Sequence, residues 1–321
     1  MIRSPLAFAL STLALLAQDP AKPAAPAVPL PAANSPEATK LVDQAIAKMT
    51  AYGRGAFKTT ESQDSAMMRG AGMPFGNDDT EIKGGWHRET VWGEHDGHDY
   101  IKANGRMLAK VGDGWKLRGS KHGGGAAVPF TLDPALLFAV LAELPAASRS
   151  VVHVEAGEVA GKDVAILSLQ LDGEVASDFA EVGVVPGSGG PGGGMMILGA
   201  MGGMGGAPDI DHTVYLALSI DPVTGDLVRF AAKVFEKNPM MGNVQIRLGG
   251  PGGAGGDEEE EKEDATEEAP SDGPVEWKKG FPKKKPAKDE SVATFRVEFS
   301  KLGLAEAPQL GDKQKALLRL H

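Results

Sequence analysis

The densest group of residues able to do chemistry is the run Glu94-His95-Asp96-Gly97-His98-Asp99. Imidazole nitrogens and carboxylate oxygens at this spacing are ligands of zinc and copper, so His95 and His98 are candidate metal ligands. A solvated surface turn is the other interpretation, because glycine and aspartate are common turn residues. The sequence leaves both open and indicates no other cofactor.

Methionine is unusually distributed. Soft thioethers bind Cu(I), which makes Met195 and Met196 further candidate ligands. A methionine-rich surface also suits a lipid or a protein partner, and low-complexity drift in an insertion is a third interpretation. Nine of the twelve methionines lie in glycine-rich surroundings: Met67, Met68, Met73, Met195, Met196, Met201, Met204, Met240 and Met241.

The sequence offers nothing for nucleophilic catalysis. It has no cysteine, no GxSxG, no HExxH and no phosphate-binding glycine loop with a lysine. Its glycine runs also lack the strand–turn–helix context of a dinucleotide site. We therefore expect a protein that is not an enzyme.

Charge is unevenly distributed along the chain. The formal net charge of −10 argues against a general nucleic-acid binder. An acidic block at 257–268 is followed by lysines from Lys278 to Lys288, with Trp277 and Phe281 among them. This basic run would suit peripheral contact with an anionic membrane, although the neighbouring acids compete for the same lysines and favour a solvated loop.

The N-terminus has the pattern of an export signal. Arg3 precedes an apolar run, Leu6 to Ala17, which is too short to span a bilayer, and we expect residues 1–17 to be a signal peptide. Residues 18–35 are rich in Pro and Ala and form a linker. We therefore expect a periplasmic or secreted protein. No other stretch predicts a transmembrane span, and the missing cysteines exclude a lipid anchor on cysteine.

Helix signals follow the linker. Ser35 and Pro36 are an N-cap and a first-turn proline, and apolar residues recur at helical spacing as far as Met49, before Gly53. Asp133-Pro134 caps a second helix, ALLFAVLAEL, which is apolar on nearly every side and is therefore expected to be buried.

Between and after these helices the sequence alternates with the period of β-strands. Asn104-Gly105 and DPVTGD (221–226) are hairpin turns, and further strands are expected at 151–154, 164–171, 212–220, 227–236 and 293–299. The predicted class is α+β, with a large curved antiparallel sheet in one domain, 36–321. The segments 186–209 and 238–290 cannot form a core and are predicted to be disordered insertions.

The order of these elements resembles the periplasmic lipoprotein carriers and their lipid-binding relatives (LolA/LppX-like). The resemblance spans about 37–320 without the insertions, and it rests on pattern: ATKLVDQAIAKM, HDYIKANGRMLAKVGDGWKL, DPALLFAVLAEL, YLALSIDPVTGDLVRF and VATFRVEFSKLG. It implies an incomplete β-barrel around inner helices. The family carries an arginine–proline pair in its second strand, whereas this chain reads GGWHRETVW, with Arg88 and no proline.

The resemblance implies binding of a lipid-like or other apolar ligand, or of a lipidated protein, rather than lipoprotein transfer in particular. Phe57, Trp86, Trp92 and Trp115 are the residues predicted to line the concavity. The same aromatic rings would fit a core that fills it. Two alternatives also stay open: an envelope interaction protein that presents Gly/Met-rich and charged loops, and a copper-binding protein. The sequence does not indicate an oligomeric state.

Overall fold

The computed structural model describes residues 29–64, 80–95, 97–118, 133–180, 211–237, 275–287 and 290–320. The predicted signal peptide, the insertion 186–209 and residues 238–274 lie outside this part of the chain. Of the predicted linker, residues 29–35 are described, and the Asn34 N–H donates to the Val151 carbonyl over 2.7 Å. The end of the linker is therefore hydrogen-bonded to the first residue of an edge strand.

The described residues of the first half of the chain form one long helix and six strands. They are α1 (Pro36–Tyr52), β1 (Arg54–Asp64), β2 (Thr80–His87), β3 (Thr90–His95), β4 (His98–Ala103), β5 (Arg106–Val111) and β6 (Gly114–Arg118).

The second half alternates between helices and longer strands. Its elements are α3 (Pro134–Glu143), η2 (Ala146–Arg149), β7 (Val151–Val159), β8 (Lys162–Asp172), α4 (Gly173–Phe179), β9 (Asp211–Ile220), β10 (Leu227–Lys237), β11 (Trp277–Lys278), β12 (Phe281–Pro282), β13 (Glu290–Ser300) and α6 (Asp312–Leu318).

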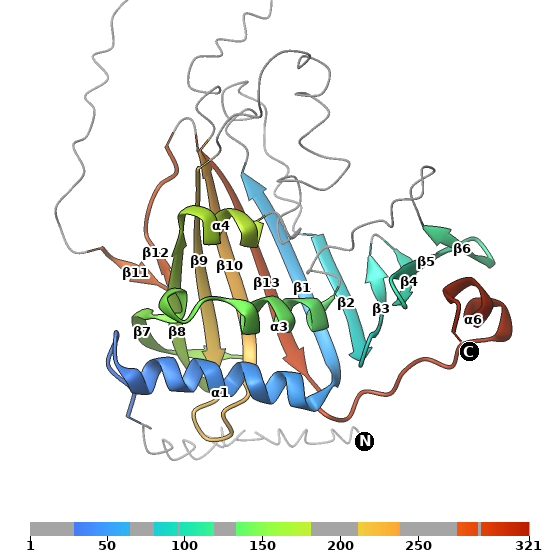
Figure 1. Cartoon of the computed structure of the whole chain (residues 1–321), viewed down its shortest axis with the longest axis horizontal. Helices are drawn as coiled ribbons and strands as arrows, with labels where there is room; N and C mark the ends of the chain where they lie inside the picture. The colour runs from blue at the N-terminus through green and yellow to red at the C-terminus, as the bar shows by residue number, and fades with distance from the viewer. Residues whose placement is uncertain are drawn as a thin grey trace, which may run out of the picture.

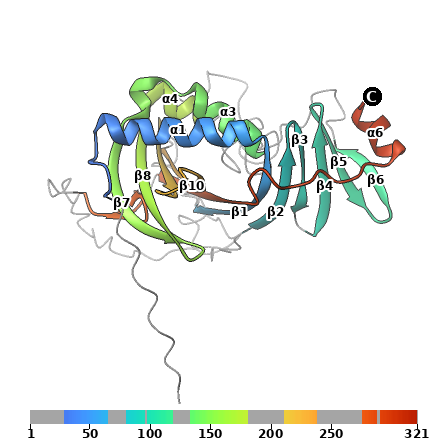
Figure 2. The same ribbon diagram turned by 90° about the horizontal axis from the view of Figure 1, so that it is seen from below.

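Eleven strands form one antiparallel sheet in the order β6-β5-β4-β3-β2-β1-β13-β10-β9-β8-β7. The sheet curves strongly but does not close, because β6 and β7 remain as its two edges (Figure 2). The predicted class, α+β with an incomplete β-barrel around inner helices, is confirmed.

Helices α1, α3 and α4 lie together on the concave side of the sheet, and α1 crosses its lower end (Figures 1 and 2). One apolar core fills the space between these helices and the strands. It includes Val42 and Ile46 of α1, Leu137 of α3 and Phe179 of α4. The concave side is therefore a packed helix-on-sheet layer.

Helix α1 forms where its end signals predict it. The Ser35 side chain accepts a hydrogen bond from the Ala38 N–H over 3.1 Å, Pro36 occupies the first turn, and Gly53 ends the helix at φ +60°. Ala38, Val42, Ala45, Ile46 and Met49 form its buried stripe. The helical spacing in the sequence thus corresponds to the face that contacts the sheet.

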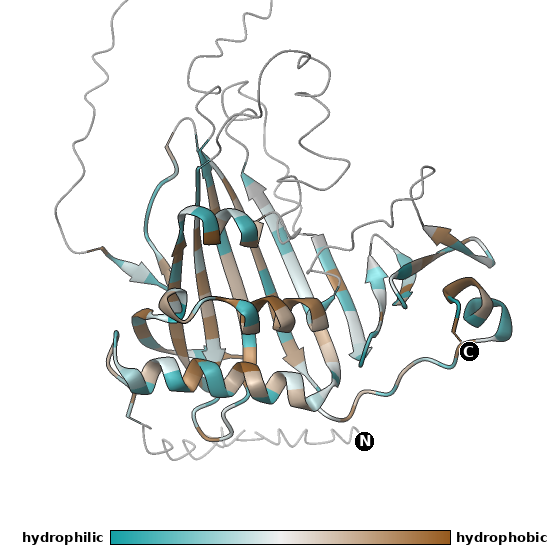
Figure 3. Cartoon of the chain, in the orientation of Figure 1, coloured by the Kyte–Doolittle hydropathy of each residue, from teal (hydrophilic) through white to brown (hydrophobic). Residues whose placement is uncertain are grey.

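Helix α3 is mostly apolar (Figure 3). Its N-cap Asp133 accepts a hydrogen bond from the Leu136 N–H over 3.3 Å. Leu137, Phe138 and Leu141 are buried against the sheet, as expected for a helix with so few polar residues.

Three features of the fold were not predicted. The short helices α4 and α6 lack the long apolar period by which α1 is recognised. Residues 275–287, which belong to the predicted disordered insertion 238–290, contain the small hairpin β11–β12 on the convex face of the sheet. The predicted insertion therefore differs from the structure at its C-terminal end, because Trp277 and Phe281 supply enough apolar surface to order the chain there.

Candidate functional site

An aromatic cluster holds helix α3 to the concave face. The Trp86 ring on β2 lies 5.8 Å from Phe138 of α3 and 6.0 Å from Phe299 of β13, measured between ring centroids. Phe57 of β1 lies 6.5 Å from Trp86. Trp86 is 1% exposed, so these rings form an interior wall between α3 and the sheet.

Glycines on neighbouring strands make room for these rings. Gly55 pairs with Trp86 across β1 and β2, and Gly84 pairs with Phe57. A Cβ atom at Gly84 would lie 2.8 Å from Phe57 Cζ. Gly55 and Gly84 have no side chains beneath the rings of Trp86 and Phe57, which lets the rings lie close to the sheet.

Trp92 and Trp115 belong to a different cluster. They pack with Ile101 and Leu108 under Leu318 of the C-terminal helix α6. Trp92 pairs with Gly85, and Trp86 pairs with Val91. Paired residues face the same side of the sheet and successive residues face opposite sides, so Trp92 and Trp86 point to opposite sides. Their cluster is separate from the one that contains α1, α3 and α4.

The structure thus divides the four residues predicted to line one concavity. Phe57 and Trp86 come together in the helix-covered layer, and Trp92 and Trp115 come together beneath α6. A single strand across residues 82–92 would place Trp86 and Trp92 on one face. The physical reason for the difference is the turn between β2 and β3, where Arg88 adopts φ +55° and the chain reverses direction.

A polar group lies at the edge of the helix-covered layer. Lys102 of β4 forms an ion pair with Asp133, the N-cap of α3; their side chains are 18% and 8% exposed. Tyr100, two residues before Lys102 on the same face, is 2% exposed and belongs to the apolar core. A Cβ atom at Gly93 would lie 2.8 Å from the Tyr100 hydroxyl oxygen, so the phenol lies over β3.

The Tyr100 hydroxyl has no hydrogen-bond partner within the part of the chain that the structure describes. Burial raises the pKa of this phenol far above its usual value, and the negative charge of Asp133 raises it further. The hydroxyl is therefore a neutral donor and acceptor on a residue of the apolar core, near the Asp133 carboxylate. Such a group marks a place where a polar atom of a ligand would be stabilised.

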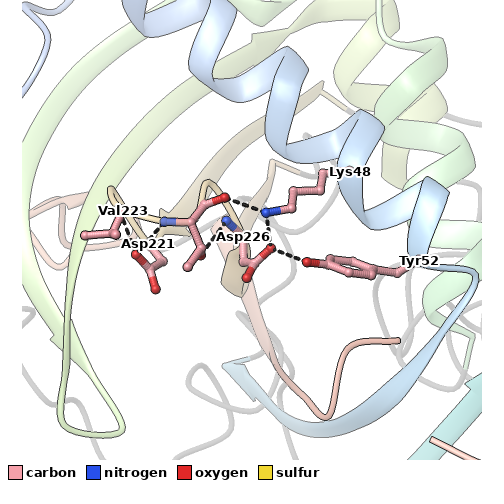
Figure 4. A network of polar contacts seen from close by, with 6 residues as sticks. Lys48, Tyr52, Asp221, Val223 and Asp226 are labelled. Atoms are coloured by element: carbon pink, nitrogen blue, oxygen red, sulfur yellow. Dashed lines mark hydrogen bonds and ion pairs between the residues drawn. The ribbon is translucent and has the colours of Figure 1, made fainter. Parts of the chain in front are cut away.

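A second polar network ties α1 to the loop between β9 and β10 (Figure 4). The Tyr52 hydroxyl donates to the Asp226 carboxylate over 2.8 Å, and Lys48 forms an ion pair with the same carboxylate at 2.8 Å. Lys48 also donates to the Thr224 carbonyl. Asp221 orders the loop from within by accepting hydrogen bonds from the Val223 and Thr224 N–H groups.

The candidate metal ligands do not form a recognisable site. His95 and His98 pair across the β3–β4 hairpin, and His98 is exposed. Met195 and Met196 lie outside the described residues. Over the ranges that the structure describes, there is no group of three or more His, Asp or Glu side chains placed to hold a metal ion.

No protein-family model matches the chain, and no curated protein is similar to it in sequence. Among solved structures, the crystal structure of LprF from Mycobacterium bovis matches 87% of this chain and 99% of its own, at 12% identity and a TM-score of 0.37. The strand order above establishes the fold independently of this likeness. No helix in the described ranges combines the length and apolar character needed to cross a membrane.

Tyr100 and the Lys102–Asp133 pair were not singled out in the sequence. The signal for them is the alternation in HDYIKA, where Tyr100 and Lys102 share one face of β4 and Ile101 and Ala103 share the other. Residues of both faces are buried in the structure: Tyr100 lies in the core that includes α3, and Ile101 and Ala103 lie in the cluster under α6. Alternation alone does not show which face meets the helices.

Proposed function

We propose that the chain is an exported carrier or sensor that binds a lipid-like ligand between α3 and the concave face of the sheet. Phe57 and Trp86 would contact the apolar part of the ligand. Trp92 and Trp115 are not included, because they lie beneath α6 in the other cluster. The ligand is a free lipid or the acyl chains of a lipidated protein.

The open sheet supports this proposal. Its concave face and the three helices that cover it form one continuous apolar layer. Each methylene group of an acyl chain that enters such a layer gains about 0.8 kcal/mol from leaving water. The helices take no part in the strand pairing, so their separation from the sheet would leave every strand pair intact.

The observation that carries the proposal is the unpartnered hydroxyl of Tyr100 inside this layer. A buried hydroxyl without a partner costs about 1–3 kcal/mol. A ligand with an ester or carboxyl oxygen next to its acyl chain would accept a hydrogen bond from Tyr100 and remove that cost. An acyl lipid has this combination of groups.

Ligand entry would require α1 and α3 to move. Polar contacts at their ends fix both helices: Lys48 and Tyr52 bind the β9–β10 loop, and Asp133 binds Lys102. Asp43 of α1 also forms an ion pair with Arg149 of η2. Apolar packing, which an acyl chain can replace, supplies much of the other attachment of the two helices. Export to the periplasm or medium is supported by Arg3 and the apolar run from Leu6 to Ala17.

Quenching of tryptophan fluorescence by a brominated fatty acid tests the location of the ligand. The chain has four tryptophans, and Trp86 is the one in the proposed layer. We expect the fatty acid to quench the wild-type protein and the Trp92→Phe and Trp115→Phe variants. The Trp86→Phe variant should bind the fatty acid but lose most of the quenching.

The Tyr100→Phe variant tests the polar contact. It removes one hydroxyl from a buried ring, so the fold should be retained, and we expect the affinity for the fatty acid to fall about tenfold. Absence of any saturable quenching of the wild-type protein would refute the proposed function. Quenching that disappears in Trp92→Phe instead would place the ligand beneath α6.

A second candidate function, an envelope interaction protein, is favoured by the register of the sheet. Asp64 of β1 pairs with Val292 of β13, and Phe235 of β10 pairs with both Val292 and Thr213 of β9. The ends of β1, β9 and β10 that carry these residues therefore meet at one end of the sheet. The Gly- and Met-rich stretches 67–76, 186–209 and 238–256 follow or precede these strand ends in the sequence. Co-purification of a stoichiometric protein partner from the native envelope, without lipid, would favour this candidate.

A further inference from the structure

The β11–β12 hairpin is anchored to the convex face of the sheet through its turn. The Gly280 carbonyl accepts a hydrogen bond from the buried Ser168 hydroxyl over 2.9 Å, and the Gly280 N–H donates to Glu155. Gly280 has φ +81°, and a Cβ atom there would lie 2.6 Å from the Ala217 Cβ. The turn therefore fits against the sheet only as glycine.

Both aromatic rings of the hairpin contact the sheet. Trp277 stacks on His153 of β7 with a centroid distance of 4.7 Å and an interplanar angle of 6°. It also forms a T-shaped pair with Tyr215, with the ring centroids 6.1 Å apart. Phe281 packs on the convex-face cluster that contains Ile166. These contacts use the apolar surface of the hairpin and hold it in one position.

The lysines of the hairpin, in contrast, are exposed. Residues 275–287 contain five lysines and one glutamate, in a chain whose net charge is −10. Lys283 forms an ion pair with Glu276, and Lys284 forms one with Glu290. Lys278, Lys279 and Lys285 are exposed, and each has no ion-pair partner among the residues described.

We propose that the β11–β12 hairpin is a membrane-docking element, in which Lys278, Lys279 and Lys285 bind the headgroups of anionic lipids. Ammonium groups beside an anionic bilayer are attracted to its negative surface potential. The inward position of Trp277 and Phe281 leaves no free ring on which nucleic-acid bases could stack, so a membrane surface is the better match.

Docking through this hairpin would place the convex face of β7–β10 toward the bilayer and leave the helices on the opposite face. The proposal does not depend on ligand binding in the concave layer. Neutralisation of the three lysines should remove most of the preference for anionic membranes without any effect on the quenching of Trp86 by a fatty acid. The two proposals can therefore fail separately.

The test measures binding of the full chain to vesicles of phosphatidylcholine alone and of phosphatidylcholine mixed with an equal amount of phosphatidylglycerol. The measured quantity is the difference in affinity between the two kinds of vesicle, and the apolar N-terminal run is the same in every variant compared. The test variant is K278Q/K279Q/K285Q. The control K40Q/K116Q/K313Q removes the same charge from exposed lysines of α1, β6 and α6.

We expect preferential binding of the wild-type chain to the anionic vesicles, with a preference that weakens as salt is added. The preference should fall about a hundredfold in the hairpin variant, which is roughly fivefold per lysine, and little in the control. Equal losses in both variants would overturn the proposal, because binding would then follow net charge. Absence of any preference in the wild-type chain at low salt would overturn it too.

Discussion

The indole of Trp86 occupies the space that a side chain at Gly55 would need. The two residues pair directly across β1 and β2, and a Cβ atom at Gly55 would lie within 2.8 Å of Trp86 Cζ2. Trp86 cannot move away, because Phe138 of α3 and Phe299 of β13 hold its other side. The position of α3 above the sheet therefore depends on a glycine in β1.

The Gly55→Ala variant should be destabilised by about 2 kcal/mol, the usual cost of overpacking a filled core. Its matched control is Gly114→Ala, because a Cβ atom at Gly114 meets nothing within 4 Å. Denaturant unfolding followed by circular dichroism measures both. If the two variants lose the same stability, the contact between Gly55 and Trp86 does not determine the packing.

Asp133 both caps α3 and neutralises Lys102. The Asp133→Ala variant should lose about 3 kcal/mol of unfolding free energy, because it leaves a largely buried ammonium group without its counter-ion. Asp133→Ser keeps an oxygen for the cap and separates the two roles. Combining Asp133→Ser with Lys102→Met should recover most of the loss, and the double-mutant cycle measures the coupling.

Helix α6 covers the cluster of Trp92 and Trp115 through Leu318, which is fully buried. The Leu318→Ala variant should lose about 2 kcal/mol of unfolding free energy and make these tryptophans more accessible to acrylamide. The control is Leu304→Ala in the same C-terminal segment, where the leucine is 75% exposed. Equal accessibility in both variants would show that Leu318 does not shield the two rings.

Much of the fold could be predicted because local signals agree with it. Ser35 and Gly53 mark the ends of α1, and Asn104 and Gly105 adopt the positive φ angles that a tight hairpin turn requires. These features depend on the backbone of a few adjacent residues. The alternating strands and the apolar helix α3 then point to a sheet with helices on one face.

The composition of the candidate site could not be predicted in the same way. Trp86 and Trp92 occur on successive strands of one hairpin, and the pairing register alone decides that they face opposite sides. Both faces of β4 are buried, because α6 covers the second one, so alternation does not identify the concave side. The isolation of the Tyr100 hydroxyl depends on contacts between distant elements.

Asp226 provides a test of pH dependence. Partial burial acts to raise the pKa of its carboxyl, but the hydrogen bonds from Lys48 and Tyr52 outweigh that effect and hold the pKa below its usual 3.8. A depressed pKa means that the folded state favours the carboxylate. The network therefore stabilises the protein above the usual pKa of aspartate, and this contribution is lost as pH falls through the folded pKa.

The Asp226→Asn variant should be about 1 kcal/mol less stable than the wild-type chain at neutral pH, because Lys48 and Tyr52 lose a charged acceptor. The difference should shrink as pH falls below 3.8, where the wild-type carboxyl also becomes neutral. The hydrogen bond to Asp226 raises the pKa of Lys48, so the same contribution should also be lost at strongly alkaline pH as Lys48 loses its proton. Asp113→Asn, in the exposed β5–β6 turn, is the control. A stability difference that persists unchanged into acid would show that the ion pair does not link α1 to the β9–β10 loop.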